Sequence, residues 1–273
     1  MATIQAAKCY GLNHLGAIAP GYQADFVVMD NLSDMNVLEV YHKGKKIIKD
    51  EKVEIRPCDP QLKNTVHLLG FRESDLRLPW REGKVHILKM MEGQIVTEDV
   101  REEVGYTEEK GRRVFKPDGT YQKIAAVERH KNTGKIGVGI VKGFGLRGGA
   151  IASSVSHDSH NLIVIGDNDH DMYLAVQELL RTQGGYTLVE NGQVFDTLPL
   201  PIMGLMSDAG YEKVNEKLAR MISKAHEMGI PEGFDPFITL SFMALPVIPE
   251  IRITPRGVYL TQEDRMIQSP FDR

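Results

Sequence analysis

Short apolar runs separated by polar turns recur along most of the chain. The run Leu162–Ile165 is uninterrupted and rich in β-branched residues, which predicts a buried strand. The same pattern of short apolar or alternating segments predicts further strands over residues 26–29, 76–78, 85–91, 95–97, 124–129, 136–141, 150–155, 251–253 and 258–260.

Two hairpins and several helices complete the pattern. Strand-like runs flank Lys43–Gly44 and the stronger turn signal Asn191–Gly192, and each pair predicts a β-hairpin. Apolar residues at helical spacing predict helices over residues 1–12, 169–182, about 208–229 and 234–245. Caps are predicted at Asp167 or Asp169 for the second of these helices, and at Ser207 or Asp208 for the third. Together these elements predict an α+β fold with mixed sheets and flanking helices.

Glycine marks two special places. Gly137 and Gly139 alternate with larger residues and leave one face of their strand bare, which indicates close approach of another backbone or of a ligand. The loop Gly143–Gly149 lacks the Gly-Lys-Ser/Thr ending of a phosphate loop, so a sharp turn is favoured. The charged segment 98–119 is typical of a solvated loop at a domain boundary, and the polar tail after Gln262 of a frayed end.

Candidate chemistry gathers in one loop, where His157, Asp158 and His160 precede the strand Leu162–Ile165. Imidazole and carboxylate groups are ligands for Zn, Mn or Fe dications, and they are also general acids and bases. The two histidines point the same way only if the loop turns helically. Alternatively, Asp158, Ser159 and Asn161 form a tight turn tied by side-chain to backbone hydrogen bonds. Both interpretations stay open.

Other polar and apolar side chains have simpler explanations. Asp167, Asp169 and Asp171 suit the first turn of a helix, and His170 and His42 suit the surface. Trp80 is expected to pack at a strand end, with ligand stacking as the alternative. A last set could line a pocket or simply fill the core, namely Met203, Met206 and Met243.

Composition excludes several classes of function. The 273 residues suffice for one or two domains, and the net charge of −4 gives no basic footprint for nucleic acid. No run approaches the roughly 18 apolar residues of a membrane span, and the N-terminus lacks the pattern of a signal peptide. Cys9 and Cys58 form neither a metal pattern nor a disulfide framework, so a cytoplasmic location is expected.

Residues 1–50 resemble the C-terminal end of an amidohydrolase-superfamily enzyme. The resemblance rests on the segment Gly16-x-Ile18-x-Pro20-Gly21-x-x-Ala24-Asp25-Phe26-Val27. It implies that residues 1–60 comprise the last helix of a barrel followed by strands of a small β-sandwich. These residues would have a structural role and no chemistry.

Residues 120–260 resemble the C-terminal domain of microbial adenine deaminase. The resemblance implies a β-rich connecting segment over residues 61–118 and a C-terminal α+β domain over residues 119–273. The matching pieces are Val127–His130, Gly143–Leu146, Gly149–Ser153, His157–Asn161, Leu198–Ile202, Gly204–Ser207 and Leu240–Glu250.

The family's activity is hydrolysis of adenine to hypoxanthine and ammonia by a water bound to a divalent metal, Mn or Fe or else Zn. The resemblance places the main metal centre in the barrel, on a His-x-His pair and further ligands, and this chain contains no His-x-His pair. We therefore expect the C-terminal part of an adenine deaminase, inactive alone, whose partners are the missing N-terminal barrel half, a purine substrate and further copies of itself. No substrate-binding residue is assigned.

Two roles stay open for the chain itself. In the first, the loop of His157, Asp158 and His160 faces the mouth of the barrel's active site, or holds a metal of its own. In the second, the chain is a non-catalytic module for interaction and oligomerisation.

Overall fold

The computed structural model describes residues 3–47 and 58–272. The chain divides into two compact units, residues 1–57 and residues 58–273. Among the helices of the described ranges, none is long and apolar enough to cross a membrane.

The first unit contains a short helix and a three-stranded antiparallel sheet. The predicted hairpin is confirmed, but the predicted burial of residues 26–29 is wrong. Val27 and Val28 are 45% and 37% exposed. Because successive strand residues point to opposite faces, the first unit by itself leaves both faces of this sheet uncovered. The elements are α1 (Ile4–Cys9), β1 (Phe26–Met29), β2 (Val37–His42) and β3 (Lys45–Ile47).

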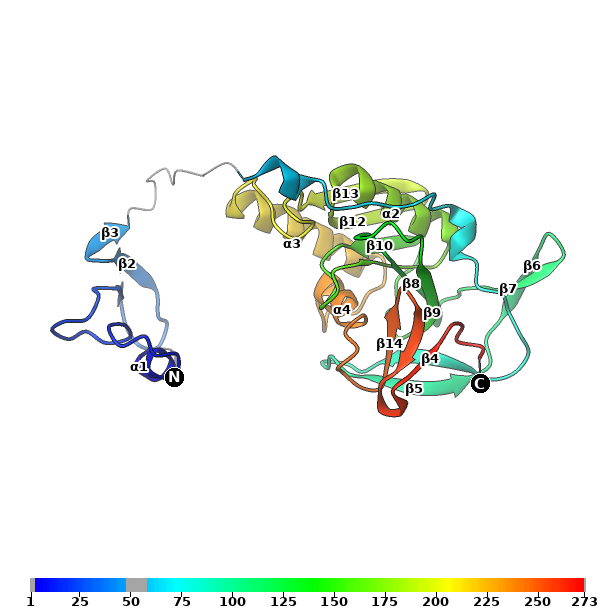
Figure 1. The fold of residues 1–273 in the computed structure, drawn as a ribbon, viewed down its shortest axis with the longest axis horizontal. Helices are drawn as coiled ribbons and strands as arrows, with labels where there is room; N and C mark the ends of the chain where they lie inside the picture. The colour runs from blue at the N-terminus through cyan, green and yellow to red at the C-terminus, as the bar shows by residue number, and fades with distance from the viewer. Residues whose placement is uncertain (1–2, 48–57, 273) are drawn as a thin grey trace. The chain divides into compact units, whose positions relative to one another are not determined.

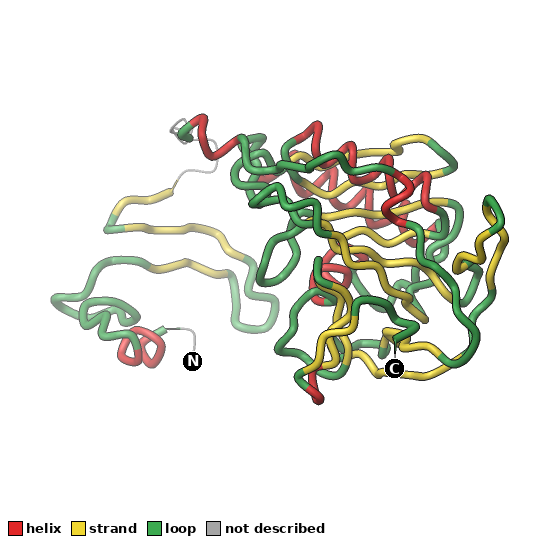
Figure 2. Tube along the Cα trace, turned by 45° about the vertical axis from the view of Figure 1, so that its right-hand side comes forward, coloured by secondary structure: helices red, strands yellow, loops and turns green. Residues whose placement is uncertain are grey.

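An eight-stranded sheet forms the centre of the second unit, in the order β13-β12-β10-β11-β8-β9-β4-β5 (Figures 1 and 2). All neighbouring strands are antiparallel except β4 and β9, which are parallel. The sheet is therefore mixed, and the predicted α+β class is confirmed. Its strands are β4 (Val85–Met90), β5 (Thr97–Glu102), β8 (Tyr121–Val127), β9 (Ile136–Lys142), β10 (Gly149–Ser153), β11 (Leu162–Gly166), β12 (Gly185–Glu190) and β13 (Gln193–Pro199).

Both faces of the large sheet are covered, which explains why β11 is a continuous apolar run. Leu162 and Val164 belong to the hydrophobic core that includes α2 (Asp169–Thr182). Ile163 and Ile165 belong to the opposite core, with α3 (Tyr211–Glu227) and α4 (Pro236–Phe242). The helix α2 is confirmed within the predicted bounds, although Asn168 caps it. The predicted caps of α3 are wrong, because Gly210 stands at its start.

A small sheet of β14 (Ile251–Thr254), β15 (Gly257–Leu260) and β16 (Arg265–Ile267) lies against β8 and β9 (Figure 1). A Cβ atom on Gly137 would lie 2.0 Å from the carbonyl oxygen of Thr254. The close backbone approach predicted for the glycines of this strand is therefore confirmed. The prediction of a frayed tail after Gln262 is wrong, because this segment contains Ile267 and Phe271, whose apolar side chains are buried.

The predicted solvated loop over residues 98–119 is also wrong. It contains β5, β6 (Tyr106–Glu109) and β7 (Arg112–Phe115), and the β6–β7 ribbon projects from the rest of the unit (Figures 1 and 2). Charged residues of β5 pair across the sheet edge, as in the 2.6 Å contact between Lys89 and Glu98. A run of mixed charges is therefore compatible with an edge strand, where opposite charges face each other. Upstream, a 3₁₀ turn over Glu73–Leu76 replaces the strand predicted at residues 76–78.

Candidate functional site

The loop that carries the predicted site residues joins β10 to β11, which are neighbours in the sheet. It makes a tight turn in which the backbone N–H of His160 donates to the carbonyl oxygen of Ser156 over 2.6 Å. His160 itself has a φ angle of +49°. Because the strands on either side are fully buried, the turn has a rigid base.

The turn brings the two histidines together and leaves the aspartate in solvent. The ring centroids of His157 and His160 lie 5.9 Å apart. His157 also stacks on Phe242 at the end of α4, with centroids 4.9 Å apart. The side chain of Asp158 is 83% exposed, and its Oδ1 lies 3.9 Å from Nδ1 of His157. The loop thus has an imidazole pair beside an aromatic ring.

A metal centre does not fit the residues present. Within residues 3–47 and 58–272, no group of three or more His, Cys, Asp or Glu side chains could hold a metal ion. The loop offers two imidazoles beside the exposed Asp158, whereas structural and catalytic zinc sites use at least three convergent protein ligands. The divalent metal that the family resemblance implies therefore has no ligand set in the described part of this chain.

Burial shapes the chemistry of His160. It lowers the pKa of this imidazole below its ordinary value, and the neighbouring charges of His157 and Arg129 lower it further. The ring is therefore neutral at pH 7. Three buried polar atoms around the loop have no hydrogen-bond partner among the residues described, namely His160 Nδ1, Ser156 Oγ and Ser241 Oγ. A neutral imidazole and two hydroxyls could each donate or accept a hydrogen bond.

A buried arginine fixes the loop from behind. Arg129 is 1% exposed, and its Nε donates to the carbonyl oxygen of His160. Its Nη1 donates to the carbonyl oxygen and hydroxyl of Thr65, over 3.0 and 3.1 Å, and its Nη2 donates to the carbonyl oxygen of Met203 over 2.9 Å. Burial lowers the pKa of the guanidinium to about 10, so the group stays charged at neutral pH. Arg129 therefore joins three segments that are distant in sequence.

Beside Arg129, the carboxylate of Glu128 closes the turn that follows β8. It accepts backbone hydrogen bonds from His130, Lys131 and Thr133, and a further one from the hydroxyl of Thr133. Burial alone would raise the pKa of this carboxyl, but the hydrogen bonds outweigh it and lower the pKa to about 2. The imidazole of His130 then donates to the carbonyl oxygen of Ser159 over 2.7 Å, which ties this turn to the histidine loop.

We expect the Glu128→Gln variant to lose about 1 kcal/mol of stability at pH 6, after allowance for solvent screening. A carboxyl pKa lowered by folding stabilises the protein above the ordinary pKa of 4.5, and this stabilisation disappears as the pH falls toward about 2. Urea unfolding of both proteins between pH 2 and pH 6 measures the difference. A difference that did not shrink on acidification would contradict this account of Glu128.

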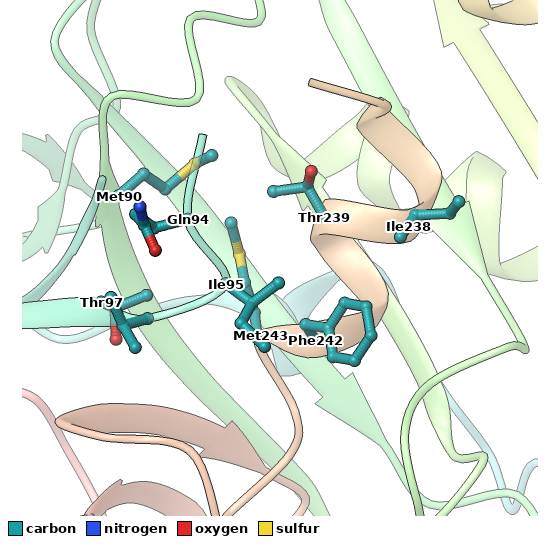
Figure 3. Close-up of a pocket in the computed structure, with 9 residues that line it drawn as sticks. Met90, Gln94, Ile95, Thr97, Ile238, Thr239, Phe242 and Met243 are labelled. Atoms are coloured by element: carbon teal, nitrogen blue, oxygen red, sulfur yellow. The ribbon is translucent and has the colours of Figure 1, made fainter. Parts of the chain in front are cut away.

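Phe242 also lines a small pocket of about 40 Å³ (Figure 3). It opens between the turn after β4 and the helix α4, so Phe242 forms a wall shared with the histidine loop. Met243 lines this pocket and is also buried in the core, whereas Met203 and Met206, which are 43% and 52% exposed, do not line it. The labelled lining residues are Met90, Gln94, Ile95, Thr97, Ile238, Thr239, Phe242 and Met243.

The remaining candidates make structural contacts. Asp167 accepts hydrogen bonds from the backbone of the Gly143–Gly149 loop, Asp169 pairs with Lys123, and Asp171 accepts from Asn168. His170 and His42 form exposed contacts with Glu73 and Asp25, at 3.0 and 3.1 Å. The indole N–H of Trp80 donates to the carbonyl oxygen of Val104, and its ring packs on Tyr106.

Sequence reasoning did not assign a role to Arg129, Phe242 or Ser241. Each lies in a segment that resembles the adenine deaminase C-terminal domain, but no nearby residue pattern indicates a functional role for it. Only the fold brings them to the histidine loop.

Comparison with known proteins matches two parts of the chain. Residues 94–265 match the family model described as the adenine deaminase C-terminal domain, and residues 1–47 match the amidohydrolase family. A protein of Desulfitobacterium hafniense (strain Y51), named adenine deaminase, is 52% identical over 98% of this chain and 46% of its own length.

Two further relatives with the same name are similar over the same extent. The protein of Nitratidesulfovibrio vulgaris (strain DP4) is 43% identical over 95% of this chain and 45% of its own length. The protein of Clostridium acetobutylicum is 42% identical over 95% of this chain and 46% of its own length. The chain therefore spans about half the length of the curated relatives it matches.

Proposed function

Since the chain belongs to the adenine deaminase C-terminal domain family, as its sequence resemblance predicts, we propose that it is one part of an adenine deaminase. The whole enzyme would hydrolyse adenine to hypoxanthine and ammonia. An amidohydrolase portion, which we propose makes up the rest of the enzyme's length, would supply the barrel, the divalent metal and the water that it activates. This chain would support that portion and cap its active site.

The observation that carries this proposal is the exposed sheet of the first unit. Its strands carry large apolar side chains on both faces, including Leu38 at 63% and Val37 at 55% exposure. A three-stranded sheet needs a packing layer to be stable, so these faces call for further protein. The match of residues 1–47 to the amidohydrolase family supports the barrel portion as that layer.

The proposal extends to the organisation of the chain. Residues 1–60 would be the end of the amidohydrolase portion, with the last barrel helix and strands of its β-sandwich. Residues 61–118 would lead into the C-terminal α+β domain of residues 119–273, with which they share the large sheet. The metal would be Mn, Fe or Zn, and the enzyme a cytoplasmic homo-oligomer.

The same exposed sheet favours a second function, an interaction module that joins copies of the chain. In the described part of the first unit, β1 and β3 are both edge strands. Unpaired edges with apolar faces are templates for association. Sizing chromatography of the purified chain tests this function, since a strict monomer at high concentration would argue against it.

Reconstitution tests the proposed deaminase. The part of the Desulfitobacterium hafniense relative that this chain does not cover would be co-expressed with the chain in cells that lack adenine deaminase. We expect the pair to release ammonia from adenine at least roughly 10³-fold faster than the chain alone. Stripping the pair of its metal should abolish the difference. Deamination by the chain alone with Mn added, at a rate lost on His157→Ala, would overturn the proposal.

A further inference from the structure

A methionine turn lies next to the histidine loop. In the turn Ile202–Met206 the backbones of its two end residues pair, and the side chains of Met203 and Met206 are 43% and 52% exposed. The backbone N–H of Met203 donates to the carbonyl oxygen of Leu62 over 2.6 Å. The turn thus exposes flexible apolar side chains from a fixed backbone.

The centre of that turn is held as firmly as its ends. The hydroxyl of Ser154 donates to the carbonyl oxygen of Gly204 over 2.6 Å. Gly204 has a φ of +71°, and a Cβ atom there would lie 2.9 Å from Nη1 of Arg129. The guanidinium therefore packs flat against the turn. The backbone of the turn is thus held by contacts within the second unit itself.

Contacts connect this turn to the pocket beside α4 through the histidine loop. Arg129 binds both the carbonyl oxygen of Met203 and that of His160. His160 lies beside His157, which stacks on Phe242. Phe242 and the 52% exposed Ile238 line the pocket together. We call the side chains along this series of contacts the imidazole–methionine face, defined by His157, His160, Met203, Met206, Ile238 and Phe242.

The composition of this face is that of a protein interface. Methionine and aromatic side chains are enriched in the cores of interfaces, whereas charged ones stand at the polar rim. The exposed carboxylate of Asp158, 3.9 Å from the imidazole of His157, would belong to that rim. Exposed apolar side chains on loops that are already ordered lose little freedom on binding, so most of their burial contributes to affinity. The imidazole of His160 is neutral at pH 7 and would cost less to desolvate than a charged group.

We propose that the imidazole–methionine face is the surface by which the second unit binds the amidohydrolase portion of the enzyme. This inference rests on the proposed function. The amidohydrolase portion is favoured over a second copy because the relatives carry more than half of their length outside the match. The first unit matches the amidohydrolase family. Because both units are in one chain, binding of the first unit to the amidohydrolase portion would raise the effective concentration of this face near the same partner.

The test uses the reconstituted pair and charges placed on the face. Met203→Glu and Ile238→Glu put a carboxylate at exposed positions, where folding of the chain itself should be unaffected. We expect each to raise the dissociation constant of the pair at least roughly tenfold, because the charge would be desolvated without a partner. The deaminase activity of the pair should be lower with either variant than with the wild-type chain when the chain is limiting. At a saturating concentration of the chain, the activity should recover. Val194→Glu, at a 41% exposed site near the Asn191–Gly192 turn, is the matched control and should change the constant less than about twofold.

Hydrogen exchange gives an independent readout. Amides of residues 202–206 and 238–242 should be protected on assembly, while those of residues 192–195 should not. A pair that assembles and is active, but whose affinity neither variant changes, would overturn this inference and leave the proposed function intact. A wild-type pair that does not assemble would overturn both.

Discussion

Replacing Arg129 with methionine should destabilise the second unit by about 3–5 kcal/mol. Methionine fills much of the same volume but donates no hydrogen bond. The carbonyl oxygens of Thr65, His160 and Met203 would all lose a donor at once. Each buried acceptor left without a partner costs about 1–3 kcal/mol, and relief of the buried charge offsets part of the sum.

Urea unfolding at pH 7 measures this effect, with the exposed Arg112→Met as the control, for which a change within about 0.5 kcal/mol is expected. Arg129→Lys should fall between the two, because a single ammonium keeps the charge but lacks the planar fork that reaches three segments. A loss below about 1 kcal/mol for Arg129→Met would mean that water or rearranged backbone satisfies these carbonyls.

The Gly137→Ala variant should lose about 3 kcal/mol. Its new methyl group would lie 2.0 Å from the carbonyl oxygen of Thr254 and 2.7 Å from the backbone nitrogen of Gly257. Both obstacles are backbone atoms at the turn of the β14–β15 hairpin, so no side chain can rotate away. The hairpin would have to separate from β9, and packing on that side of the large sheet would loosen.

Gly105→Ala is the matched control, because nothing lies within 4 Å of the position that its Cβ would take. It should change the free energy of unfolding by less than about 0.5 kcal/mol. Thermal and urea unfolding of both variants compare them directly. Equal stabilities would show that the hairpin moves aside at little cost.

The local sequence pattern was sufficient to predict the structure of a segment where the segment itself contained the signal. The alternating glycines of β9 indicated the close approach of a backbone, and Asn191–Gly192 and the apolar spacing of α2 indicated their elements. The pattern failed where the partner is distant in sequence. The pattern around Glu98 indicated a solvated loop because the partners of these charges lie on β4. The pattern of residues 26–29 indicated burial, although nothing else in the first unit covers them.

The candidate site was predictable only in part. The spacing of His157 and His160 allowed both rings to face the same way, and they do lie near each other. Arg129 could not be recognised as the group behind them. A charged residue at the end of a strand ordinarily suggests the surface, and its acceptors come from Thr65 and Met203 on either side in the sequence. Burial of a cation among carbonyl oxygens is a property of the assembled fold.

The position of β4 has a practical consequence for anyone who shortens this protein. It lies between β9 and β5 in the sheet, and it supplies Ile87 to one core and Leu88 to the other. A fragment cut at the limits of the family match, residues 94–265, would omit β4. It would make β9 an edge strand of the large sheet and separate β5 from that sheet. It would also omit the buried Phe271. A piece that keeps the whole unit, with all its strands and the buried Phe271, runs from residue 58 to residue 273.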